Sequence, residues 1–231
     1  QGITRGSTVP TDQQRLGDFT SNSGAVIDPA SGQPFPNSTI PSNRIDALAR
    51  RMLDYYPRGN VSGSFYSSTQ MLRNDTNQAG LKLDAILGAR DTFSARYFFS
   101  QGESRIPFSI LGSDVPGFPV QDNLRSQLFT MTENHVAGST VNTLRASLFR
   151  HFYLLEKRLS GLTPRGVGFG FDSTLGYAEG MPFITMGGYS NIGDPAIGPR
   201  DTTQNDFEVQ DAFARSTARH NLKFGLEFRR T

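Results

Sequence analysis

Apolar and polar residues alternate most regularly near the end of the chain, in residues 222–229. Every second residue there is apolar, and the residues between are charged or glycine. A β-strand points successive side chains to opposite sides, so this pattern predicts a strand with one apolar and one charged face. The apolar positions are Leu222, Phe224, Leu226 and Phe228, and the others are Lys223, Gly225, Glu227 and Arg229.

The same alternation recurs in pairs of segments and predicts three antiparallel hairpins, at about 77–100, 125–154 and 205–230. The turn within each hairpin has roughly four to six residues, the usual range for hairpin loops. The connections between hairpins, roughly 101–121 and 155–203, are much longer and rich in glycine. The pattern therefore predicts about six strands, with the long connections gathered at one end.

Two features of the second hairpin break the alternation. In its outgoing strand, Phe129 and Met131 lie on one face and Leu128 and Thr130 on the other, so the pattern does not decide which face is apolar. In its returning strand, Arg150 interrupts an otherwise apolar row.

Residues 1–76 are rich in Ser, Thr, Asn, Pro and Gly, which predicts a long loop. One short helix is expected at 43–55, because apolar residues recur there at helical spacing, Ser42 can cap the start and Pro57 ends it. Loops of this length are uncommon and usually functional.

Short turns at one end and long loops at the other are typical of transmembrane β-barrels. We therefore predict an all-β fold of antiparallel up-and-down hairpins, contributing about six strands of a larger barrel with long extracellular loops, and divide the chain into 1–76 and 77–231. A soluble secreted β-sandwich binding module remains the alternative, with the same apolar faces buried between two sheets. In a barrel, the lipid-facing residues would include Phe93, Tyr97, Leu222, Phe224, Leu226 and Phe228.

Composition narrows the class of protein. Hydrophobic residues make up 36% of the 231 residues, and no run of about 18 apolar residues exists, which excludes a helical membrane protein. The formal net charge of +2 gives no reason to expect a nucleic-acid partner. Cysteine is absent, which excludes disulfides and thiol catalysis.

No motif indicates an enzyme, a cofactor or a metal site. The three histidines, His135, His151 and His220, show no metal-ligand spacing with one another. The glycine-rich stretch at 166–171 lacks the lysine of a phosphate-binding loop and predicts a flexible loop instead. We expect no catalytic residue and no cofactor.

Aromatic residues in the long loops are candidates for contact with a sugar or a peptide, although packing within the loops explains most of them equally well. The candidates for ligand contact are Tyr66, Phe171, Tyr177 and Tyr189. Charged residues on the other face of the strands would line the barrel lumen: Lys82, Asp84, Arg96, Arg145, Lys223 and Glu227.

Several segments resemble, in order, the TonB-dependent outer-membrane transporters of the large, Oar-like type. The similar segments are residues 9–11, 15–19, 27–29, 32–36, 40–46, 55–57, 93–97, 141–145, 187–194 and 219–230. Residues 141–145 read Val-Asn-Thr-Leu-Arg, and Thr143 stands where that family usually has Glu.

The resemblance implies a barrel of about 22 strands in the bacterial outer membrane, closed by a plug domain, which takes up a large nutrient with energy from TonB. The nutrient could be an oligosaccharide, a peptide or a metal chelate. The chain resembles an early barrel segment of such a receptor. The implied partners are outer-membrane lipid, the plug domain, the remaining strands, and TonB through the plug.

Overall fold

The computed structural model describes residues 1–108, 112–156, 160–172, 174, 180–195 and 198–231. Contacts between backbone positions divide the chain into two compact units. The loop unit comprises Gln1–Arg73, Arg105–Gln121 and Leu155–Pro199, and the sheet unit comprises Asn74–Ser104, Asp122–Leu154 and Arg200–Thr231. The loop unit thus includes the two later connections as well as the first long loop.

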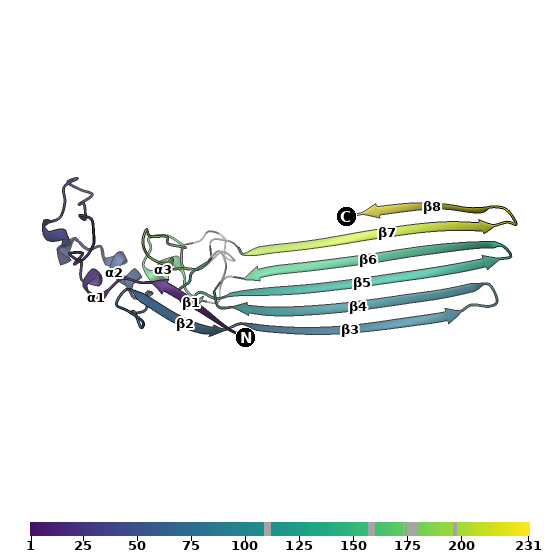
Figure 1. The fold of residues 1–231 in the computed structure, drawn as a ribbon, viewed down its shortest axis with the longest axis horizontal. Helices are drawn as coiled ribbons and strands as arrows, with labels where there is room; N and C mark the ends of the chain where they lie inside the picture. The colour runs from purple at the N-terminus through teal and green to yellow at the C-terminus, as the bar shows by residue number, and fades with distance from the viewer. Residues whose placement is uncertain (109–111, 157–159, 173, 175–179, 196–197) are drawn as a thin grey trace. The chain divides into compact units, whose positions relative to one another are not determined.

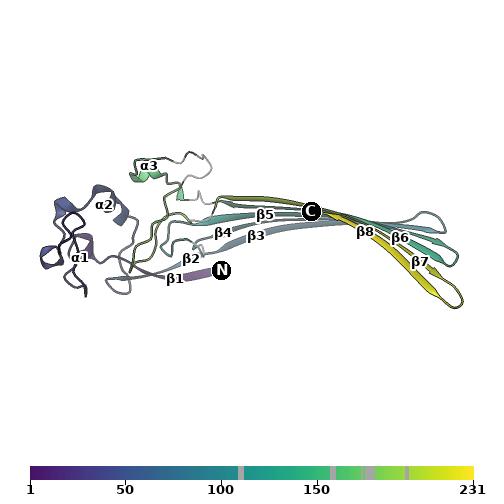
Figure 2. The ribbon, with the colours of Figure 1, turned by 90° about the horizontal axis from the view of Figure 1, so that it is seen from above.

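The sheet unit is built on one six-stranded sheet in which the strands lie in chain order, β3-β4-β5-β6-β7-β8 (Figure 1). Each strand therefore pairs with its neighbours in sequence. The strands are β3 (Arg73–Ile86), β4 (Asp91–Ile106), β5 (Val120–Ala137), β6 (Thr140–Glu156), β7 (Arg200–Ser216) and β8 (Asn221–Arg230). Seen from above, the sheet bends along its strands instead of lying flat (Figure 2).

These strands confirm the three predicted hairpins, with different ends. β5 has 18 residues and β7 has 17, well beyond the roughly 10 needed to cross a membrane. The extra residues are mostly polar, so their alternation carries no apolar signal. The turn between β5 and β6 is also tighter than expected, since only residues 138 and 139 lie between the strands and Gly138 has a positive φ of 60°.

The loop unit contains a second sheet that the sequence did not predict. β1 (Gly2–Thr8) pairs antiparallel with β2 (Phe65–Met71), from Gly2 opposite Met71 to Thr8 opposite Phe65. β1 has the sequence Gly-Ile-Thr-Arg-Gly-Ser-Thr, which has no apolar face. Its partner is more than 50 residues away, so neither pattern nor proximity indicates the pairing.

Helices in the loop unit are short: α1 (Asp12–Arg15), η1 (Pro36–Ser38), η2 (Ser42–Arg44), α2 (Ala47–Leu53) and α3 (Pro164–Val167). The prediction of one helix at 43–55 was therefore wrong at its start. Asp46 is the N-cap of α2, and its carboxylate accepts hydrogen bonds from the backbone of Leu48 and Ala49. Ser42 instead begins the separate 3-10 turn η2. An N-cap carboxylate accepts hydrogen bonds from the backbone N–H groups two and three residues later, so it fixes where the helix begins.

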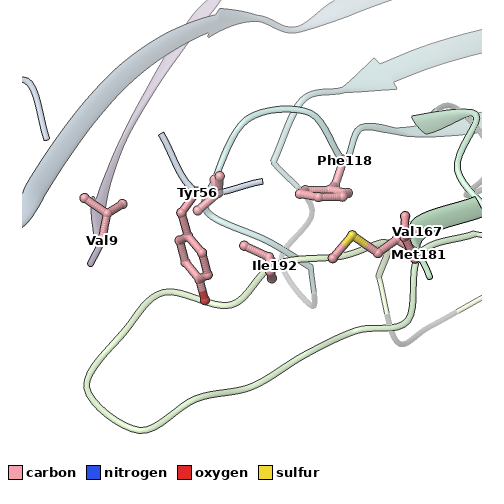
Figure 3. Packing of buried hydrophobic residues seen from close by; sticks show 7 residues of the cluster. Val9, Tyr56, Phe118, Val167, Met181 and Ile192 are labelled. Carbon is pink, nitrogen blue, oxygen red and sulfur yellow. The ribbon is translucent and has the colours of Figure 1, made fainter. Parts of the chain in front are cut away.

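Residues from all three segments of the loop unit form its hydrophobic core (Figure 3). The buried members are Val9, Tyr56, Val115, Phe118, Val167, Met181 and Ile192. The Tyr56 hydroxyl donates to the carbonyl of Ser190 at 2.7 Å. Burial, and to a lesser extent the nearby Tyr189, raises the pKa of Tyr56 to about 12.

Arg15 ties α1 to the end of α2 through backbone carbonyls. Its guanidinium donates to the carbonyl of Leu53 at 2.7 Å and to those of Tyr56 and Pro57 at 2.9 Å. Desolvation lowers the pKa of Arg15, but arginine stays charged at any physiological pH. No helix in the described part of the chain is long and apolar enough to cross a membrane.

Candidate membrane-facing surface

Side-chain contacts between strands identify which residues share each face of the sheet unit. On one face, Thr143 donates to Asn134 at 2.8 Å, Ser126 and His151 are 3.1 Å apart, and Gln78 reaches Ser100 at 3.4 Å. We call this the polar face. The residues expected to line the lumen share its positions along β3, β4, β6 and β8.

Contacts on the opposite face join the alternate residues of the same strands. Gln127 donates to the Tyr97 hydroxyl at 2.7 Å, which links β5 to β4. Asn142 donates to Asp211 at 2.8 Å, which links β6 to β7. Because side chains alternate, Phe129 and Met131 lie on the same face as Tyr97, which resolves the ambiguity of this strand.

We call this second surface the apolar face. In the β7–β8 pair, Val209 lies opposite Phe228, and Phe213 lies opposite Phe224. Asp211, opposite Leu226, interrupts the row and is held by its hydrogen bond from Asn142. The main apolar members are Leu81, Leu83, Phe93, Tyr97, Phe99, Phe129, Met131, Leu144, Leu148, Phe207, Val209, Phe213, Leu222, Phe224, Leu226 and Phe228.

Nothing among the described residues covers the apolar face at β8. Phe224 is 64% exposed, Phe228 is 65% exposed and Leu226 is 76% exposed. In a β-sandwich these side chains would be buried against a second sheet. Their exposure therefore contradicts the sandwich alternative.

Polar side chains border the apolar face at both ends of the strands. Asp91 and His135 are joined by a hydrogen bond beside the short turns. Arg125 and Arg150 lie toward the long connections. On β8, four alternate apolar positions span about 20 Å, at roughly 3.3 Å per residue. This length is close to the apolar band of about 25 Å on known outer-membrane barrels.

A family model described as "Outer membrane beta barrel domain" matches residues 1–231. The chain belongs to this outer membrane beta barrel family. Its location is therefore the bacterial outer membrane, and its hairpins are those of a barrel, as the sequence predicted. Searches of curated proteins and of solved structures returned no match.

The structure separates the aromatic residues that were expected to contact a ligand in the barrel's loops. Tyr66 is half-buried against the core of the loop unit, and Tyr189 is half-buried as well, which raises its pKa. Phe171 is 53% exposed, and the centroid of its ring lies 5.6 Å from that of Phe169. Tyr177 lies outside the described residues. No ring contact within the described part of the chain joins these candidates to one another.

The loop unit has an apolar cleft of about 290 Å³, which sequence patterns could not reveal. It lies between α2 and the last long connection, and Phe19 and Ile40 complete one wall. Its lining includes Phe19, Ile40, Ile45, Met52, Ile184 and Ile192. Because the residues come from distant parts of the chain, only the folded loops create the cleft.

One cluster of possible metal ligands is not visible in the spacing of the histidines, because two strands contribute to it. Asp91, Glu133 and His135 place one ligand atom each within 4.8 Å of one another, and all three are partly buried. Glu133 and His135 are two residues apart on β5, and the pairing of β5 with β4 in the sheet brings Asp91 beside them. The hydrogen bond between His135 and Asp91 accounts for their approach without a metal.

Proposed function

We propose that this chain supplies six strands and the extracellular loops of a TonB-dependent receptor that takes up a large nutrient. The observation that carries this proposal is the exposed apolar face of a six-stranded meander whose long connections all leave from one end. The collinear sequence segments shared with Oar-like transporters support the dependence on TonB.

In this proposal the apolar face contacts outer-membrane lipid and the polar face borders the lumen and the plug domain. Six strands are too few to close, since the smallest membrane barrels have about eight. The outer edges of β3 and β8 expose unpaired backbone groups, which favour pairing with further strands. The remaining strands of the receptor are the partners that would satisfy these edges.

The loop unit would capture the solute. Its own hydrophobic core holds the loops in one arrangement, so a binding surface is formed in advance and less ordering accompanies binding. The apolar cleft offers a place for an apolar part of an oligosaccharide, a peptide or a metal chelate. The chain performs no catalysis in this scheme. Energy from TonB moves the plug, and the solute is then released.

Uptake assays can test this role in cells that express the full-length protein. The probes are a labelled oligosaccharide mixture, a labelled peptide mixture and a ferric chelate, each offered to cells with and without functional TonB. We expect one probe to bind at the surface of both cells and to accumulate only when TonB is present. Accumulation that is equal without TonB would contradict the proposal.

A further inference from the structure

Two arginines, Arg125 and Arg150, lie together on the apolar face where lipid contact would end. Arg150 follows Leu148 on β6 at the next position of that face, and Arg125 lies beyond Phe129 on β5. Both side chains are exposed. An arginine on a lipid-facing surface is unfavourable at the membrane centre and tolerated near the headgroups, so this pair marks the level of the headgroups.

The two arginines share one hollow. A depression of about 600 Å³ is lined by Arg125, Gln127, Arg150 and Phe152. On the polar face Ser126 lies against His151, so their neighbours on the apolar face also meet across β5 and β6. This places the two guanidinium groups diagonally across the hollow, with the Phe152 ring on one side.

A contact within the sheet orients Arg125 without neutralising it. Arg125 donates to the side-chain oxygen of Gln101 at 3.1 Å, and Gln127 is held by the Tyr97 hydroxyl. Among the residues that the structure describes, no carboxylate forms an ion pair with Arg125 or Arg150. The hollow therefore carries two positive charges that nothing in the described structure balances.

We propose that this hollow binds a phosphate group on the headgroup of a lipid in the outer leaflet. The planar guanidinium matches a phosphate through two parallel hydrogen bonds, which a compact ammonium cannot form. The acyl chains of the same lipid would lie along the apolar face below the hollow, while Phe152 packs at the interface. The long connections leave from this end of the strands, which places the hollow in the outer leaflet.

This inference rests on the proposed contact between the apolar face and lipid. The test uses the full-length protein, extracted from outer membranes in mild detergent and stripped of lipid. The probes are lipopolysaccharide, the same lipopolysaccharide after chemical removal of its phosphates, and inorganic phosphate alone. Native mass spectrometry counts the lipid molecules retained, and a titration gives the apparent Kd.

We expect tight retention of the phosphorylated lipid and weaker binding of the dephosphorylated one. Replacing each arginine should weaken binding about fivefold, from the attraction that one arginine contributes at an anionic surface. R125Q/R150Q should therefore bind the two lipids almost equally. R125K/R150K keeps the charge and loses the two parallel hydrogen bonds of each guanidinium, so its binding should be intermediate. R145Q removes an arginine from the polar face of β6, the strand that carries Arg150, and should bind the lipids like the wild type.

Equal binding of both lipids by the wild type, or unchanged binding by R125Q/R150Q, would overturn the inference. Displacement of the lipid by low millimolar inorganic phosphate would also overturn it, because the ligand would then be free phosphate. If R125Q/R150Q fails to fold, R125K/R150K tests the inference. Lipid binding by R125K/R150K that is identical to the wild type would contradict recognition of the phosphate by the guanidinium groups. Recovery of the protein in the soluble fraction, with neither lipid bound, would instead contradict the proposed function.

Discussion

The side chain of Leu226 is mostly exposed, and so are those of Phe224 and Phe228 on the same face. Apolar surface left in water is unfavourable by about 25 cal/mol per Å², so a row of such side chains needs a cover. We propose that the lipid of the outer membrane supplies it. By contrast, Asp211 on the same face is tolerated through its hydrogen bond from Asn142.

Replacing Phe224 by arginine tests this at a single position. F224R should weaken assembly in the membrane by about 2–4 kcal/mol if the residue lies near the bilayer centre, because arginine there is exposed to hydrocarbon. The measurement is the free energy of folding into vesicles, obtained from denaturant titration.

Q210R provides the matched control, since Gln210 lies on the polar face opposite Glu227. It introduces the same side chain on the other side of the sheet and should change the free energy by less than about 1 kcal/mol. Equal losses for the two variants would mean that the apolar face does not contact lipid.

At the scale of elements, the apolar face was predictable for strands with regular alternation and not for the others. β8 and the middle of β4 alternate clearly, whereas Phe129 and Met131 in β5 needed the contact between Gln127 and Tyr97 to be assigned to a face. β1 has only glycine and polar residues besides Ile3, and the loop aromatics could not be sorted into packed and exposed ones. Both depend on contacts between residues far apart in sequence.

The start of α2 also escaped prediction, because Ser42 and Asp46 are both suitable caps and only the backbone conformation chooses between them. D46A should destabilise the loop unit by about 1 kcal/mol, since two backbone N–H groups lose their acceptor. S42A keeps those hydrogen bonds and should have little effect. Hydrogen exchange at Leu48 and Ala49 distinguishes the two, and equal protection in both variants would contradict the capping role.

At the scale of the molecule, the proposed arrangement in the membrane has defined sides. The long connections would be outside the cell and the turns between strands would face the periplasm. Because the chain has no cysteine, single cysteines introduced into it can be labelled without background.

S31C in the first long loop and R219C in the turn before β8 both replace exposed residues. In intact cells a membrane-impermeant thiol reagent should label S31C and leave R219C unlabelled. After the outer membrane is opened, the reagent should label both variants, which shows that neither cysteine is too buried to react. Labelling of R219C in intact cells would show that the turns face outward, opposite to the proposed orientation.

The core of the loop unit limits how its three segments can be exchanged. Val9 and Tyr56, Phe118, and Met181 with Ile192 come from three separate connections, and each fills space that the others leave. A graft of one connection from a relative would bring side chains of the wrong shape against two native partners. If the loop unit captures the solute as proposed, exchange of specificity should therefore require moving all three connections as a set.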